Sequence, residues 1–177
     1  MTLAGSKPAI WRRFVVPGSI TLGRLHEVVQ VVMGWTDSHL HSFVADGDFY
    51  TAKSRDGVDL EMDGLDESKY RLCDVAPVAR NKIQYQYDFG DSWEHTLLVE
   101  KIIPVAERPQ LYVCLAGANR CPPEDCGGLG GYYYLLEILS DPEHKEHEER
   151  MAWIGEKIDP GEFSLEQINK DLKACRF

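Results

Sequence analysis

The chain has 177 residues, of which 44% are hydrophobic, and this is enough to bury the core of one globular domain. No stretch of about 18 apolar residues is present and the first residues lack a secretory signal pattern, which excludes a membrane-spanning protein and predicts a cytoplasmic one. The net charge is −10, with 13 acidic and 6 basic residues in 121–177, so direct binding to a nucleic-acid backbone is disfavoured.

The N-terminal half predicts a strand, a helix and a pair of strands. Residues 8–16 alternate apolar side chains in the pattern of a strand. Apolar residues then recur every three or four positions over 22–33, which predicts a helix that ends at Gly34. Residues 39–52 predict two strands joined by an Asp-Gly-Asp turn, and the polar stretch 55–81 predicts a long excursion with one short helix.

The second half predicts a hairpin followed by helices. Residues 83–102 alternate apolar and polar side chains on both sides of a Gly-Asp-Ser turn, which is the clearest hairpin pattern in the chain. The apolar run 132–139 predicts a helix, and a second helix is predicted to start at Pro142. Ser164 and Gln167 form a capping box that predicts the start of the last helix.

This order of elements is typical of an α+β fold. We expect a β-grasp-like mixed sheet with one packed helix, a long hairpin and a helical C-terminal extension. A single domain is predicted over 1–177. Within it, 6–103 would form the core of sheet and helix, and 112–177 would form a Cys/Gly-rich loop and a helical extension packed on that core.

Two histidines lie two positions apart on a predicted strand. His39 and His41 therefore point to the same face, which is a common geometry for holding a metal ion. Leu40 on the opposite face indicates a strand that is at least half buried. The alternative interpretation is that both histidines are structural and hydrogen-bond to backbone groups or carboxylates.

Acidic residues and a histidine gather at the tip of the predicted hairpin. They are Asp88, Asp91, Glu94 and His95, all within the segment DFGDSWEH. Aspartate and glycine are ordinary turn residues, so one interpretation is that Asp88 only bonds backbone groups of its own turn. The other interpretation is that the tip contributes to a polar or metal-binding site.

The cysteines suggest a metal site or a rigid loop. Five cysteines in a chain without an export signal favour metal ligands or buried thiols over disulfides. Cys121 and Cys126 have four residues between them, at the wide end of zinc-knuckle spacing, and two prolines stiffen the link. Two thiolates need two further ligands, which Cys114, His95, His39 or His41 could supply. In the alternative interpretation, Asp125 caps the following helix and the glycines allow close backbone contact.

Four segments of the sequence, taken in order, together resemble the plasmid ORF-three-like family, named after a reading frame of a root-inducing plasmid. They are KPAIWRRFVVPGSITLGRLHEVVQVVMGWTDSHLHSF, YQYDFGDSWEHTLLVEKI, CPPEDCGGLGGYYYLLEIL and DPEHKEHEERMAWIGEKIDPGEF, and the resemblance runs from residue 6 to residue 172. Some members are labelled insertion-element passenger or TnpR-like proteins. The resemblance implies a mobile-element association without an established activity, and members share the histidine pair, the hairpin tip and the Cys/Gly loop.

Three functions are consistent with these patterns. The first is a cytoplasmic binding or interaction module with a protein partner and no assigned catalytic residue. The second is a zinc-site protein, structural or hydrolytic, and the third is a mobile-element accessory protein acting near DNA. The predicted polar cluster comprises His39, His41, Asp88, Asp91, Glu94, His95, Glu124 and Asp125. The predicted zinc ligands are Cys121, Cys126, His39, His41 and His95.

Overall fold

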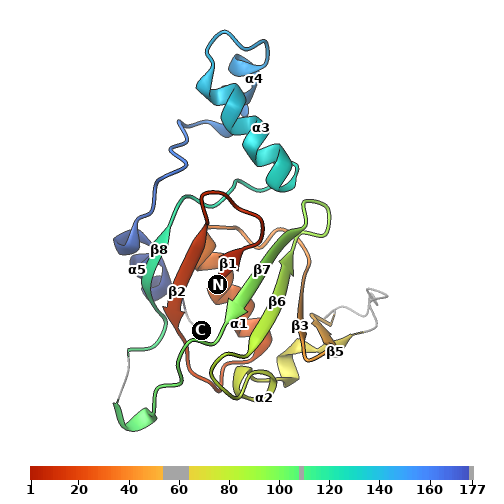
Figure 1. Cartoon of the computed structure of the whole chain (residues 1–177), viewed down its shortest axis with the longest axis vertical. Helices are drawn as coiled ribbons and strands as arrows, with labels where there is room; N and C mark the ends of the chain where they lie inside the picture. The colour runs from red at the N-terminus through yellow and green to blue at the C-terminus, as the bar shows by residue number, and fades with distance from the viewer. Residues whose placement is uncertain (54–63, 108–109, 176–177) are drawn as a thin grey trace.

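A computed structural model describes residues 1–53, 64–107 and 110–175 and confirms a mixed α+β architecture (Figure 1). Its described strands form a sheet in the order β5-β4-β3-β6-β7-β1-β2-β8. Neighbouring strands are antiparallel, except that β4 and β5 are parallel. The strands are β1 (Thr2–Leu3), β2 (Trp11–Val15), β3 (His41–Ala45), β4 (Asp48–Thr51), β5 (Leu65–Asp66), β6 (Lys82–Tyr87), β7 (Trp93–Leu98) and β8 (Val113–Ala118).

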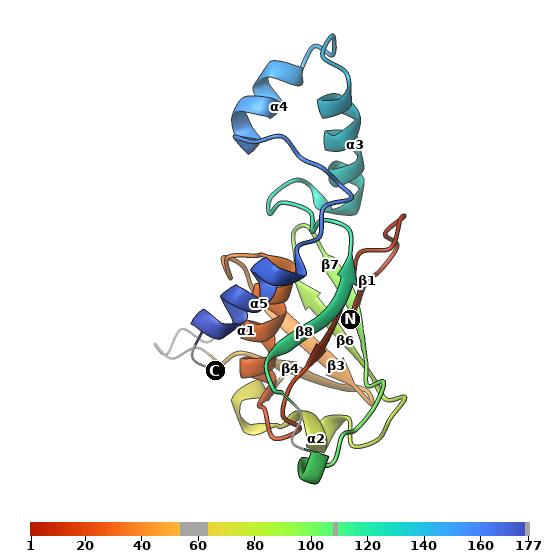
Figure 2. The ribbon, with the colours of Figure 1, turned by 90° about the vertical axis from the view of Figure 1, so that its left-hand side faces the viewer.

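Helix α1 (Leu22–Met33) covers one face of the sheet and ends where the sequence predicts (Figure 2). Thr21 Oγ1 accepts a hydrogen bond from the backbone N of Arg24 at 3.3 Å and so caps the first turn. Gly34 has a φ of 88°, a left-handed conformation that glycine adopts without strain. The apolar stripe of the helix is buried against the sheet.

The hairpin of β6 and β7 carries the largest buried side chains of the sheet. Ile83, Tyr85 and Tyr87 alternate along β6 and are each exposed by no more than 1%. Trp93 and His95 lie opposite Tyr87 and Tyr85 across the strand pair. The strand alternation predicted from the sequence is therefore the alternation between core and solvent.

Strand β8 is not predicted from the sequence, because its small residues show no clear alternation of apolar and polar side chains. It pairs with β2 at the edge of the sheet, and the buried guanidinium of Arg12 fastens this pair to α1. Arg12 donates hydrogen bonds to the carbonyl oxygens of Trp11 (2.8 Å), Val32, Ala118 and Asn119 (2.9 Å each). Backbone carbonyls thus satisfy this buried cation.

Helices α3 (Gly128–Ser140) and α4 (His147–Ile154) form an arm that extends away from the sheet (Figures 1 and 2). The prediction that the second of these helices starts at Pro142 is wrong. The side chain of Asp141 accepts a hydrogen bond from the backbone N of Glu143 at 3.0 Å, which holds a turn before the helix begins.

The remaining helices are short or lie at the C-terminal end. Helix α5 (Leu165–Ala174) contacts α1 and β8, and Ser164 Oγ accepts a hydrogen bond from the backbone N of Gln167, the N-cap contact that the capping box predicts. The short helices are η1 (Glu67–Lys69), α2 (Leu72–Val75) and η2 (Val105–Glu107). Residues 54–63 of the predicted excursion lie outside the described residues. No helix in the described ranges is long and apolar enough to cross a membrane.

Candidate functional site

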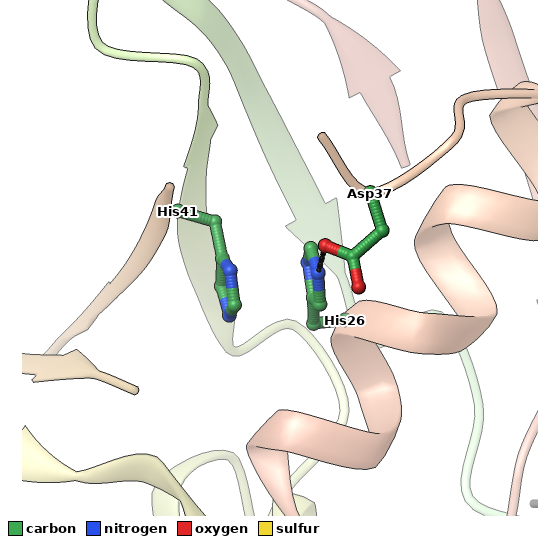
Figure 3. A group of neighbouring side chains, drawn as sticks. All are labelled: His26, Asp37 and His41. Atoms are coloured by element: carbon green, nitrogen blue, oxygen red, sulfur yellow. Dashed lines mark hydrogen bonds and ion pairs between the residues drawn. The ribbon is translucent and has the colours of Figure 1, made fainter. Parts of the chain in front are cut away.

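A pair of stacked histidines lies between α1 and the start of β3. His26 of α1 and His41 of β3 have ring centroids 3.4 Å apart and ring planes that differ by 2° (Figure 3). Nε2 of His26 lies 2.7 Å from Oδ1 of Asp37, and Nε2 of His41 lies 2.9 Å from Oε2 of Glu67. A carboxylate only accepts, so both Nε2 atoms donate. His26, Asp37 and His41 are called the stacked-histidine group below.

Tyr85 fixes the second ring nitrogen of His26. Its hydroxyl lies 2.8 Å from Nδ1 of His26 and accepts a hydrogen bond from Nε2 of Gln30 at 3.0 Å. With Nε2 of His26 donating, the hydroxyl of Tyr85 donates to Nδ1 of a neutral imidazole. Burial, followed by the proximity of His41, lowers the pKa of His26 to about 4, so this ring is uncharged at neutral pH.

A second group forms where the three sequence motifs meet. Nε2 of His39 lies 3.2 Å from Oδ1 of Asp125 and 3.7 Å from Oδ2 of Asp88. One ligand atom from each residue lies within 4.8 Å of the others. Nε2 of His39 is enclosed, and it makes no hydrogen bond of acceptable geometry within the described part of the chain. His39, Asp88 and Asp125 are called the tip group below.

The loop of residues 121–127 reaches the tip group because it is tied to two other segments. Trp35 Nε1 donates to the carbonyl of Pro122 at 3.0 Å. The carboxylate of Glu124 accepts hydrogen bonds from the hydroxyl of Tyr87 and from the backbone N of Thr36, the latter at 3.1 Å. Burial and the neighbouring Glu124 raise the pKa of Tyr87, so its hydroxyl keeps the proton that it donates.

The glycines after this loop allow close backbone approach. The backbone N of Gly127 donates to Oδ2 of Asp91 at 3.1 Å, and a Cβ on Gly128 would lie 2.5 Å from the carbonyl oxygen of Asp91. Gly127, with a φ of 90°, occupies the N-cap of α3. The prediction that Asp125 caps this helix is therefore wrong, because its side chain faces His39 instead.

The predicted zinc ligands do not form one group. His41 and His39 belong to the two separate groups above, and neither group contains a cysteine or His95 within the described residues. Burial raises the pKa of Cys126 to about 12 and raises that of Cys121 as well, so both thiols are protonated at neutral pH. His95 is fully buried and bonds the carbonyl of Trp93 through Nδ1 at 2.9 Å.

The other predicted polar residues have different roles. Oδ1 of Asp88 accepts hydrogen bonds from the backbone N of Gly90 (2.9 Å) and Asp91 (3.3 Å), so its predicted turn role is present together with its place in the tip group. Glu94 is exposed on β7, between the buried Trp93 and His95, and belongs to neither group. The sequence did not predict the roles of three residues, which are His26, Asp37 and Glu67. For His26, the available signal was a histidine on the apolar stripe of α1.

The two groups differ in what they can do chemically. The two imidazoles of the stacked-histidine group are buried and their Nε2 atoms are hydrogen-bonded to carboxylates, although 55% of the Asp37 side chain is exposed. The tip group is open on one side, because 70% of the Asp125 side chain is exposed. A pair of buried, hydrogen-bonded imidazoles suits a structural role, whereas the exposed carboxylate of Asp125 leaves room for water or a ligand beside His39.

Comparisons with known proteins agree with the resemblance noted from the sequence. A family model described as plasmid pRiA4b ORF-3-like protein matches residues 1–167. The uncharacterized protein y4hQ of Sinorhizobium fredii is 38% identical over 173 residues, which cover 96% of this chain and 87% of that protein. The crystal structure of MM3350, a protein of unknown function from Methanosarcina mazei, has a TM-score of 0.79 and 36% identity, and the match covers 93% of this chain and 92% of that one.

Proposed function

The chain belongs to the plasmid pRiA4b ORF-3-like family, and we propose that it binds a divalent metal ion at the tip group. His39, Asp88 and Asp125 come from three segments that are far apart in the sequence. Their convergence within 4.8 Å is the observation that carries the proposal. Five cysteines, all unpaired, suit the reducing cytoplasm that we propose as its location.

The tip group offers one imidazole nitrogen and two carboxylate oxygens. Imidazole favours zinc and similar ions and carboxylates favour harder ions, so a mixed set suits Zn²⁺ or Mn²⁺. Two carboxylates held this close repel each other, and a cation between them removes that repulsion. Three protein ligands leave coordination positions for water, and activation of that water is the chemistry that a bound ion would supply.

The tip group is arranged before any ion binds. The two backbone hydrogen bonds to Oδ1 of Asp88 leave Oδ2 facing His39. Asp88 and Asp125 have φ values of 55° and 59°, in the left-handed region that residues other than glycine rarely adopt. Such strained conformations gather at functional sites, where the surrounding structure holds them. Here, the contacts of Asp91 and Glu124 provide that hold.

Metal content of the purified, chelator-treated and reloaded chain tests this proposal. Asp88→Asn keeps an oxygen for the backbone N–H groups but removes the charge that binds the ion, and we expect it to bind one equivalent of Zn²⁺ fewer than the wild type. Glu94→Gln is the matched control, an acid-to-amide change at an exposed position of the same hairpin, and should bind as the wild type does. Equal zinc content in Asp88→Asn and the wild type would overturn the proposal.

A further inference from the structure

We infer that the stacked-histidine group is a second metal site, distinct from the tip group and structural in role. Its three residues come from α1, from the link between α1 and β3, and from β3 itself (Figure 3). One ligand atom of each of His26, Asp37 and His41 lies within 4.8 Å of the others. An ion at this place would join the helix to the sheet that it covers.

The ring nitrogens of the two histidines suit metal binding. Nε2 of His41 donates to the buried carboxylate of Glu67, which leaves Nδ1 of that ring for other partners. A carboxylate behind a metal-bound imidazole is the usual arrangement, because it fixes the tautomer and makes the ligand more basic. Glu67 would have this role for His41.

For His26, metal binding needs one shift of a proton. Nε2 now carries the proton that it donates to Asp37, and Nδ1 accepts from Tyr85. With the ion on Nε2, the proton moves to Nδ1 and the hydroxyl of Tyr85 becomes the acceptor. The ring stays neutral, so the step releases no proton, and Asp37 is freed to bind the ion.

The charges around the two rings also point to a cation. Asp37 and Glu67 bring two carboxylates against the pair of rings, and a divalent ion matches that charge. The nitrogen lone pairs lie in the ring planes, so an ion shared by both histidines requires the two rings, now parallel at 3.4 Å, to turn out of the stack.

Two imidazoles and one carboxylate give this site a softer ligand set than the tip group. The class of ion is therefore a borderline transition metal such as Zn²⁺ or Co²⁺. Because the two Nε2 partners are carboxylates and the thiols of Cys121 and Cys126 lie outside the group, bound Co²⁺ should lack a thiolate charge-transfer band.

Cobalt binding to full-length variants tests the inference separately from the proposed function. Asp88→Asn removes the tip group and should retain one equivalent of Co²⁺ with a nitrogen- and oxygen-ligand spectrum. The double variant Asp88→Asn/Asp37→Asn should bind none. Asp37 has 55% of its side chain exposed, so this change is tolerated by the fold. Asp46→Asn in place of Asp37→Asn is the matched control, an exposed aspartate with a φ of 50°, and should keep the equivalent.

A variant of the residue behind His41 adds a measurement of Co²⁺ affinity to this test. Glu67→Gln should keep the equivalent but weaken Co²⁺ affinity roughly 10- to 100-fold, as expected for a partner that orients a ligand. The inference is overturned if Asp88→Asn binds no Co²⁺, if the double variant keeps its equivalent, or if a thiolate band appears. The proposed function fails instead if Asp88→Asn binds as many equivalents as the wild type.

Discussion

His95 should make the protein lose stability in acid, and the size of the loss follows from its surroundings. The side chain is 0% exposed, and its Nε2 makes no hydrogen bond to the described residues. Burial lowers the pKa of His95 from 6.5 to about 3, because a charged imidazole would lose its hydration there. Between about pH 3 and pH 6.5, His95 is therefore neutral in the folded protein and protonated in the unfolded chain.

The contribution of His95 to stability depends on pH, because its pKa is lower in the folded protein than in the unfolded chain. Above pH 6.5 the imidazole of His95 is neutral in both states, so its contribution to stability is fully present. Below pH 6.5 the unfolded chain binds more protons than the folded one, and the free energy of unfolding falls as the pH falls. At pH 5 the loss is roughly 2 kcal/mol, and it grows to roughly 4 kcal/mol near pH 3.

Urea denaturation at pH 7.5 and pH 5.0, with a chelator present, measures this contribution. His95→Asn keeps a donor for the carbonyl of Trp93 but cannot be protonated, so its free energy of unfolding should fall by roughly 2 kcal/mol less than that of the wild type between these pH values. Ile83→Val is the control: it should lose about 1 kcal/mol at both pH values and keep the wild-type pH dependence. A His95→Asn variant as acid-sensitive as the wild type would show that protonation of His95 does not cause the loss of stability.

Three further predictions concern the contacts that hold the loop and the sheet edge. Gly131→Ala places a Cβ against the carbonyl oxygen of Cys126, and its free energy of unfolding in urea should be roughly 1–3 kcal/mol lower than that of the wild type. The control Gly130→Ala meets open space and should be neutral or stabilising. Equal effects of the two substitutions would contradict this prediction. Arg12→Gln leaves buried carbonyls without donors, so the free energy of unfolding measured in urea should fall by roughly 3–5 kcal/mol. A fall of less than about 1 kcal/mol would contradict a stabilising role for these hydrogen bonds. Glu124→Gln weakens two loop anchors by about 1–2 kcal/mol, so hydrogen exchange of residues 121–127 should accelerate; unchanged exchange would show that other contacts hold the loop.

Elements with strong local signals could be predicted from the sequence. The period of α1 and its terminal Gly34 defined that helix, and strand alternation defined the β6–β7 hairpin. Ser164 marked the start of α5 through its own hydrogen bond. These signals lie within a few residues of the structure that they specify, so no tertiary information was needed.

The features that depend on contacts between distant segments could not be predicted. β8 is a strand because its backbone pairs with that of β2, and its small side chains show no pattern that predicts a strand. His26 sits on the apolar stripe of α1, where a core role is the ordinary interpretation, and its partner Asp37 looks like a turn residue. The pairing of His39 with Asp125 instead of with a cysteine depends on how the loop docks, which spacing alone does not determine.

Anomalous diffraction from crystals of the zinc-loaded protein tests directly whether the tip group binds the ion. We predict an anomalous peak about 2.0–2.2 Å from Nε2 of His39 and from a carboxylate oxygen of each of Asp88 and Asp125. The same peak should be missing from crystals of Asp88→Asn grown and loaded in the same way. A wild-type crystal that holds zinc elsewhere, with no peak among these three side chains, would contradict the proposed function.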